Sequence, residues 1–147
     1  MSFYEVLLSK MAGFHNFQRD ALPEGNPGRR WLEAKRWCQQ HFTHMVTLQN
    51  QEETDFLREW LPVNRKHYWI GVRKTGGMWI WDQTGEEVPE DVQKWAANEP
   101  DNSAGQDCVE IYIKKDNDTA IWNDENCFRK KGTVCYNGKI LMSFDLY

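Results

Sequence analysis

The chain has 147 residues, of which 40% are hydrophobic and 27% are charged, with a mild net charge of −4. This length fits one domain, and this composition is typical of a globular protein rather than of a disordered one. No apolar run approaches the roughly 18 residues that cross a bilayer, so we predict no membrane insertion. The basic residues are too thinly spread to favour nucleic-acid binding.

The N-terminal part has no clear periodicity, and we predict an irregular segment over residues 1–28 that ends in the turn-forming sequence LPEGNPG. Its longest apolar run, residues 6–8, is far shorter than the roughly 7–15 residues of a signal-peptide core, so no signal peptide is visible. A structured domain is expected over residues 29–137, followed by a C-terminal tail over residues 138–147.

Helical spacing of apolar side chains predicts an amphipathic helix over residues 29–42 that carries Cys38 inward. A short strand is expected at residues 45–49. A second helix is expected over residues 51–61, opened by a capping box of Asn50 and Glu53 and ended by the following proline.

The rest of the domain reads as short strands and loops. A hairpin is predicted from residues 67–74 and 78–82 around two glycines, and a long loop from 83 to 105. Three further strands are expected at residues 108–113, 119–124 and 132–137. Two helices followed by five or six short strands predict an α+β fold. The tryptophans of these strand patterns are expected in the core: Trp69, Trp79, Trp81 and Trp122.

The four cysteines have spacings that match neither a zinc knuckle nor a thioredoxin-like site, so they indicate two disulfides. An even cysteine count and the N-glycosylation acceptor at Asn117 favour an extracellular compartment. Three pairings are possible. Pairing Cys108 with Cys127 is favoured, because the strands that they flank can be neighbours, and Cys38 then pairs with Cys135.

Acidic residues are concentrated between residues 98 and 127. This segment contains eight acidic residues and two lysines, which gives it a net charge of −6. The favoured disulfide brings two acidic stretches together, so that either one carboxylate is protonated or a divalent cation lies among them. Hard oxygen donors suit Ca²⁺, and the candidates are Glu99, Asp101, Asn123 and Asp124. The alternative is a solvated acidic turn. The basic run that ends at Lys131 is expected to be a solvated face.

Three short motifs carry a resemblance to a known family: WIG at residues 69–71, EPD at 99–101 and WND at 122–124. Together with the four cysteines they resemble the C-type lectin domain, over residues 31–136. The stretches YWIGVRKTGGMWIW and WNDENC are most similar to the selectin-type lectin domain. The resemblance implies the C-type lectin-like α+β fold, the disulfide pairing favoured above, and calcium-dependent sugar binding without catalysis.

The resemblance also implies roles for single residues. The implied calcium ligands are Glu99, Asp101, Asn123 and Asp124, with a cis peptide before Pro100. The implied carbohydrate contacts are Glu99, Asp101, Asn123 and, for further sugar atoms, Asn102, Glu110, Tyr112 and Glu125. The implied partners are glycans or glycoproteins, of the mannose or fucose type rather than the galactose type, in recognition or cell adhesion by a secreted protein or an ectodomain.

The chain departs from the family pattern at three positions. Asp101 stands where the mannose- and fucose-binding triplet has asparagine, and it lacks the amide donor for a sugar hydroxyl. Gln106 stands where selectins usually have an acid, and His67 replaces an aromatic hydroxyl. These departures keep one alternative open, a protein-binding domain of the same fold that has lost sugar binding. A weaker alternative is a glycosidase-like hydrolase that uses Glu99 and Asp124.

Overall fold

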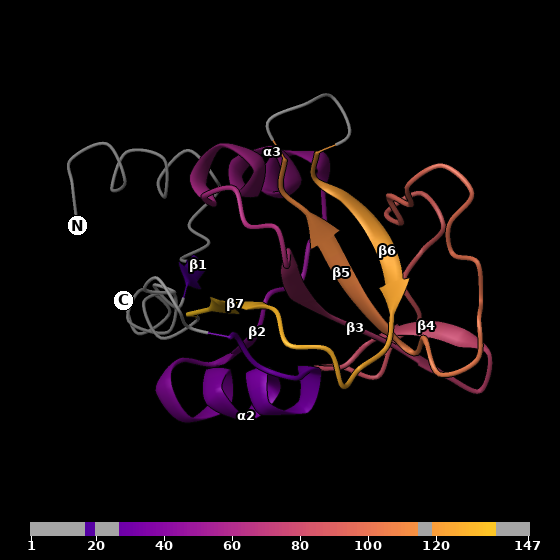
Figure 1. Ribbon diagram of the computed structural model, residues 1–147, viewed down its shortest axis with the longest axis horizontal. Helices are drawn as coiled ribbons and strands as arrows, with labels where there is room; N and C mark the ends of the chain where they lie inside the picture. The colour runs from indigo at the N-terminus through magenta and orange to yellow at the C-terminus, as the bar shows by residue number, and fades with distance from the viewer. Residues whose placement is uncertain (1–16, 20–26, 115–118, 138–147) are drawn as a thin grey trace, which may run out of the picture.

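The computed structural model describes residues 17–19, 27–114 and 119–137, and these form a mixed sheet with two helices (Figure 1). The elements are β1 (Phe17–Arg19), α2 (Trp31–His41), β2 (His44–Met45), α3 (Gln51–Trp60), β3 (Tyr68–Thr75), β4 (Met78–Trp81), β5 (Cys108–Tyr112), β6 (Ile121–Glu125) and β7 (Gly132–Tyr136). The predicted α+β class is confirmed. No described helix has the length and apolar character that crossing a membrane requires.

Both helices form where the sequence predicted them. Helix α2 buries Trp31, Ala34 and Cys38 on one face. Helix α3 begins at the predicted cap, where the Asn50 side chain accepts a hydrogen bond of 2.9 Å from the backbone N–H of Glu53. The Glu53 carboxylate reaches back to the backbone N–H of Gln49, at 2.8 Å, so the capping box closes one residue earlier than expected.

The sheet has the strand order β1-β7-β3-β5-β6, with β2 paired to β7 and β4 to β3. Strands β3 and β7 run parallel, whereas β3 with β5 and β5 with β6 run antiparallel. In Figure 1 the paired β5 and β6 extend between the side of the molecule that carries α3 and the side that carries β4. The end of β6 lies beside β4 and the long loop that leads to β5. This end of the sheet carries the acidic residues.

Two sequence predictions need correction. The segment 1–28 was expected to be irregular, but residues 17–19 form β1, which pairs with β7 through Gln18 opposite Cys135. The strand expected at residues 45–49 is limited to His44–Met45. Beyond it Val46 and Leu48 are buried but form no strand, because Val46 donates to β7 and accepts from β3 instead of continuing one ladder.

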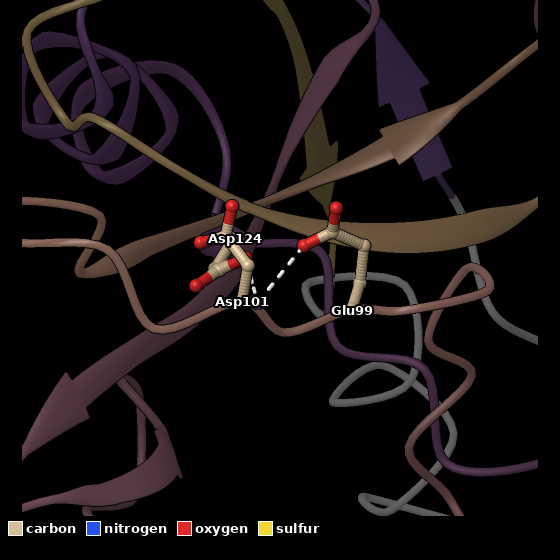
Figure 2. A group of neighbouring side chains, drawn as sticks. All are labelled: Glu99, Asp101 and Asp124. Atoms are coloured by element: carbon tan, nitrogen blue, oxygen red, sulfur yellow. Dashed lines mark hydrogen bonds between the residues drawn. The ribbon is translucent and has the colours of Figure 1, made fainter.

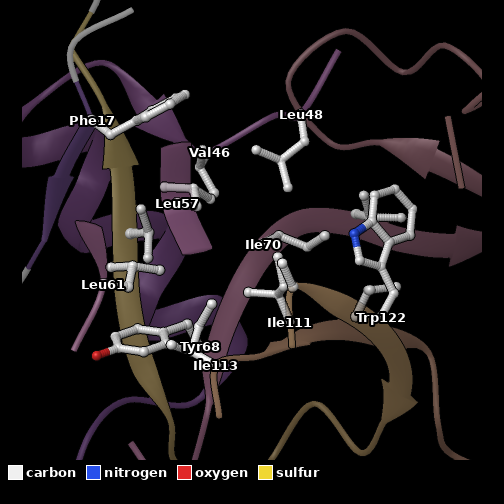
Figure 3. Close-up of a cluster of buried hydrophobic side chains, with 14 of the residues drawn as sticks. Phe17, Val46, Leu48, Leu57, Leu61, Tyr68, Ile70, Ile111, Ile113 and Trp122 are labelled. Carbon is white, nitrogen blue, oxygen red and sulfur yellow. The ribbon is translucent and has the colours of Figure 1, made fainter. Parts of the chain in front are cut away.

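The core lies between the sheet and α3, where Val46, Leu57, Ile70 and Ile111 are fully buried (Figure 3). The four tryptophans that were expected in the core are at most 8% exposed. A second apolar cluster joins α2 to the sheet through Trp31, Trp69 and the two disulfides.

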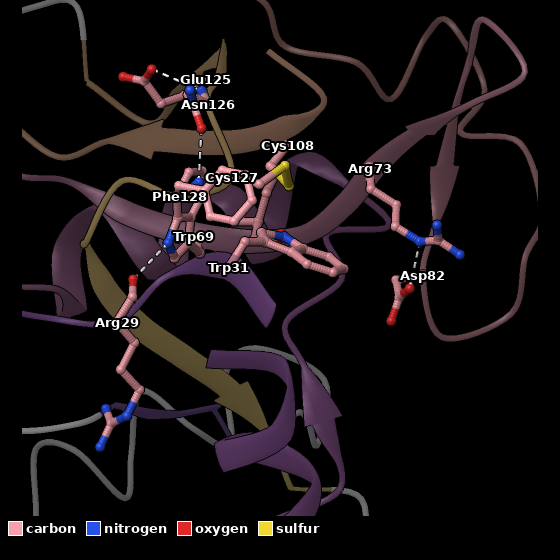
Figure 4. Close-up of a disulfide and its surroundings, with 11 residues drawn as sticks. Arg29, Trp31, Trp69, Arg73, Asp82, Cys108, Glu125, Asn126, Cys127 and Phe128 are labelled. Carbon is pink, nitrogen blue, oxygen red and sulfur yellow. Dashed lines mark hydrogen bonds and ion pairs between the residues drawn. A yellow bond between two sulfur atoms is a disulfide. The ribbon is translucent and has the colours of Figure 1, made fainter. Parts of the chain in front are cut away.

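Both disulfides have the favoured pairing. Cys38 bonds to Cys135 with Cα atoms 5.4 Å apart, and Cys108 bonds to Cys127 with Cα atoms 5.2 Å apart. Figure 4 shows the second bridge above Trp31 and Trp69. It ties the first residue of β5 to the turn that follows β6, and therefore holds the acidic end of the sheet together.

The long loop between β4 and β5 is held mainly by aromatic packing. The Trp95 ring lies 5.0 Å from Trp79 and 5.6 Å from Trp122, measured between ring centroids. Backbone hydrogen bonds add to this, from Trp122 to Lys94 at 2.7 Å and from Ala96 to Trp122 at 2.8 Å. The loop is thus attached to β6 just before it reaches Glu99.

Candidate metal centre

Three carboxylates meet at the end of β6. Glu99 and Asp101 come from the long loop and Asp124 from β6, and one oxygen of each lies within 4.8 Å of the others (Figure 2). The peptide bond between Glu99 and Pro100 is cis, as the resemblance implied. The structure therefore brings together three of the four residues that were predicted as calcium ligands, from two distant stretches of the chain.

Backbone N–H groups of the loop bind these carboxylates. Asp124 is fully buried and accepts hydrogen bonds from Asp101 N at 3.2 Å and from Asn102 N at 2.9 Å. The same N–H of Asp101 also donates to Glu99 Oε2 at 3.0 Å, and Ser103 N donates to Asp101 Oδ1 at 2.9 Å. Each carboxylate accepts from the backbone, yet no described cation pairs with any of them.

The electrostatics of the cluster disfavour three negative charges. Partial burial raises the pKa of Glu99, and its contacts with Asp124 and the charges of Asp101 and Asp124 raise that pKa further. A hard divalent cation would reverse this effect, because carboxylate oxygens are the ligands that Ca²⁺ prefers. In the same loop the side-chain oxygen of Gln106 is buried and accepts no hydrogen bond from the described residues. The oxygen donors present therefore fit calcium.

Asn123, the fourth predicted ligand, lies beside Asp124 on β6. Its Nδ2 donates to Glu110 Oε1 at 3.1 Å, across the ladder that pairs the two residues. Because the nitrogen of the amide is turned toward Glu110, the amide oxygen of Asn123 is turned away from Glu110.

The residues predicted to touch further sugar atoms differ in exposure. Asn102 is exposed and accepts a hydrogen bond of 2.8 Å from Lys74 Nζ, whereas Tyr112 and Glu125 are half-buried. Glu110 is only 3% exposed. The N-glycosylation acceptor at Asn117 and the predicted tail over residues 138–147 lie outside the described residues.

An aromatic pair borders this region. The His67 and Tyr112 rings lie 4.6 Å apart, and Lys114 Nζ lies 4.5 Å from the Tyr112 ring centroid. Burial raises the pKa of Tyr112 to about 12, and the nearby carboxylates, Glu110 first, add to this. Burial lowers the pKa of His67 to about 4, and the charges of Lys131 and Lys114 contribute. The imidazole is therefore neutral at physiological pH.

One residue of the site region was misjudged from the sequence. Lys131 was expected on a solvated face, but it is 7% exposed and forms an ion pair with Glu110. Nothing in the basic run distinguishes Lys131 from Lys130, which is exposed. The burial depends on partners that are distant in the sequence, so no local signal could have revealed it.

Comparison with known proteins gives a consistent family. Residues 28–137 match the Lectin C-type domain. E-selectin of Oryctolagus cuniculus is 48% identical over 105 residues, which cover 71% of this chain and 19% of that protein. The chain thus spans about a fifth of that relative's length.

Two solved structures illustrate the range of proteins with this fold. The C-type lectin domain of murine dendritic cell inhibitory receptor 2, in complex with N-glycan, has a TM-score of 0.69 and 25% identity, and covers 83% of this chain and 89% of that one. A calcium-independent type II antifreeze protein has a TM-score of 0.68 at 20% identity, over 85% of this chain and 87% of that one. The second likeness concerns the fold alone.

Proposed function

This chain belongs to the C-type lectin domain family, and from that premise we propose that it is a calcium-dependent carbohydrate-binding module. The proposed calcium ligands are Glu99, Asp101, Asn123 and Asp124. The observation that carries the proposal is the convergence of three carboxylates within 4.8 Å from two segments. Such a cluster costs free energy by itself, and a divalent cation converts the repulsion into binding energy.

When bound, calcium supplies coordination positions for two vicinal sugar hydroxyls. The Glu99 carboxylate is partly exposed and accepts a hydrogen bond from one of these hydroxyls. Asn123 Nδ2 carries two protons, one of which is donated to Glu110 while the other remains to donate to a sugar oxygen. Asp101 is exposed and can only accept, so this chain offers one amide donor fewer than an asparagine at that position would.

Further sugar atoms are proposed to contact the surface beside the metal centre. Asn102, Tyr112 and Glu125 carry polar atoms there, and Asn102 is held by Lys74. The buried Glu110 offers little surface to a sugar, so its proposed contribution comes from behind the metal ligands. We retain mannose- and fucose-type glycans ahead of galactose-type ones, because Glu99 is the first residue of the triplet.

The proposed setting is extracellular, in a secreted protein or an ectodomain that recognises glycans or glycoproteins. Two disulfides persist in an oxidising compartment. Glycosylation at Asn117 and the division into residues 1–28, 29–137 and 138–147 remain predictions. Cell adhesion is proposed on the likeness to E-selectin, which extends over one segment of that protein.

The second candidate is a protein-binding domain of the same fold that has lost sugar binding. Asp101 favours this candidate, since it removes an amide donor from the sugar site and adds a negative charge. The fold likeness to a calcium-independent antifreeze protein indicates that this architecture also occurs without calcium. The glycosidase alternative loses its support, because the family is one of lectins rather than enzymes.

Retention on immobilised glycans tests the proposal. The oxidised chain is passed over mannose-, fucose- and galactose-terminated glycans in millimolar calcium and then eluted with a chelator. Calcium-dependent retention is expected, together with calcium uptake by calorimetry. Calcium uptake without retention on any glycan would favour the protein-binding candidate, whereas no calcium uptake would exclude the proposed site.

A further inference from the structure

Lys131 is a buried cation behind the proposed metal ligands. Its Nζ pairs with Glu110 Oε2, lies 3.7 Å from Glu125 Oε2 and donates to Lys66 O at 3.2 Å. The ammonium also lies 5.3 Å from the centroid of the Trp69 ring, within range of a cation–π contact. Lys131 is therefore held from four sides, by β3, β5, β6 and the segment before β3.

Glu110 lies between Lys131 and Asn123. One carboxylate oxygen faces the Lys131 ammonium, and the other accepts the hydrogen bond of 3.1 Å from Asn123 Nδ2. Glu110 is 3% exposed, and Asn123 stands directly opposite it on β6. A chain of three polar side chains thus runs from a buried lysine to the amide of a proposed calcium ligand.

We propose that Lys131 and Glu110 are positioning residues that fix the amide of Asn123, so that its oxygen is presented to the metal centre. This inference rests on the proposed function. Both side chains are almost fully buried, so their proposed role is exerted through Asn123. Glu110 selects the orientation of the amide, and Lys131 holds Glu110 in place.

The selection follows from the chemistry of the groups. The two ends of an asparagine amide have nearly the same shape, but only the nitrogen end donates. A carboxylate that is paired with an ammonium presents acceptors to its other neighbour, so Asn123 must turn its nitrogen toward Glu110 and its oxygen away. A reversed amide would set two oxygens against each other in a buried site, where an acceptor without a donor is destabilising.

Lys131 is needed because a buried carboxylate without a partner is costly. Its ammonium is confined by the Trp69 ring and the Lys66 carbonyl, so it keeps the Glu110 carboxylate on the side of the ladder where Asn123 lies. Partners of this kind around metal ligands typically change metal affinity by about 10–100-fold when they are removed.

The test separates this role from a merely structural ion pair. Lys131→Met alone leaves the Glu110 charge unpaired and lowers stability, so the informative variant is the neutral double substitution Glu110→Leu with Lys131→Met, which leaves no side-chain acceptor for Asn123 Nδ2 at position 110. Thermal unfolding in chelator is expected to be close to that of the wild type, while calorimetry gives a calcium dissociation constant that is about tenfold or more higher. Lys130→Met controls for the loss of a lysine from the same basic run, since Lys130 is exposed, and its calcium affinity is expected to be unchanged.

A second measurement needs neither a variant nor bound metal. In the chelated wild-type chain, NMR of the Asn123 side-chain amide is expected to show one Nδ2 proton protected from solvent exchange. Unprotected protons, or wild-type calcium affinity in a folded double variant, would overturn the positioning role. Failure of the wild type to take up calcium would instead overturn the proposed function itself, with the amide signal still reporting on the local hydrogen bond.

Discussion

The buried carboxylate of Asp124 accepts a hydrogen bond of 2.9 Å from the backbone N–H of Asn102, 22 positions earlier in the chain. This bond fastens the acidic loop to β6 through the loop's own backbone. Because the carboxylate binds N–H groups of the loop, the proposed ligands are held near one another by the protein alone. Calcium binding is therefore expected to order little additional chain.

Replacing Asp124 is expected to remove calcium binding. Asp124→Asn keeps the shape of the side chain but removes its charge and turns one acceptor into a donor, which then faces a backbone N–H. We expect calcium affinity to fall by more than about a hundredfold, because loss of an outer-sphere partner alone costs about 10–100-fold. Calorimetry measures the calcium affinity, and glycan retention should be lost in parallel.

Asp107→Asn is the control for that substitution. Both substitutions replace aspartate with asparagine, so the change in net charge is identical. Asp107 is exposed and lies in the same loop, but it is not among the clustered carboxylates. Its calcium affinity should stay close to that of the wild type. Equal losses in the two variants would mean that general charge, and not the cluster, attracts the ion.

Asp101→Asn is expected to strengthen sugar binding at some cost in calcium affinity. The substitution restores an amide donor for a coordinated hydroxyl, while its oxygen can still accept from Ser103 N. Loss of one exposed charge should weaken calcium binding by about 1 kcal/mol, or roughly fivefold. A glycan array at saturating calcium should show increased mannose- and fucose-type binding. An unchanged array profile would rule out the missing donor as the limit on sugar affinity.

The two disulfides are expected to contribute unequally to stability. Cys38 and Cys135 are 97 positions apart, whereas Cys108 and Cys127 are 19 apart. In the chain-entropy treatment these closures contribute about 5 and about 3 kcal/mol, respectively. Each disulfide is removed by replacing both of its cysteines with alanine. In urea unfolding, the variant without the Cys38–Cys135 bridge should lose more free energy of unfolding than the variant without the Cys108–Cys127 bridge.

Calcium affinity should respond in the opposite order. Cys127 follows β6 three residues after Asp124, and Cys108 opens the neighbouring strand, so the shorter bridge clamps the end of the sheet that carries the metal centre. Removing this bridge should weaken calcium binding more than removing the longer one. A larger loss of calcium affinity in the Cys38 and Cys135 variant would contradict this role.

The elements that could be predicted are those whose residues carry a local pattern. Helix α2 buries side chains at helical spacing, and the caps of α3 are short-range hydrogen bonds. The three-residue strand β1 is too short to show an alternation, and it exists because β7 offers it a partner. The predicted strand at 45–49 was too long for a similar reason, since Val46 bonds to two different strands.

The acidic residues of the site were recognisable because negative charge is conspicuous in a sequence and the motifs around it are specific. Lys131 was not, because its burial is set by Glu110 and Trp69, which come from other strands. Charge alone favours an exposed position for a lysine, and three-dimensional neighbours overrule that preference. Residues that act behind a site are accordingly harder to predict than residues that line it.

His67 is expected to make the fold less stable as the pH falls from about 6.5 to about 4. Burial lowers the pKa of His67 to about 4 in the folded chain, whereas an unfolded histidine titrates near 6.5. Between these values the unfolded chain binds a proton that the folded chain does not, so acid favours unfolding. His67→Asn removes the imidazole that binds this proton, and asparagine tolerates the φ of 61° at this position. Urea unfolding in chelator should therefore give a wild-type free energy of unfolding that declines relative to that of the variant only below about pH 6.5. If the two free energies changed in parallel with pH, this role of His67 would be refuted.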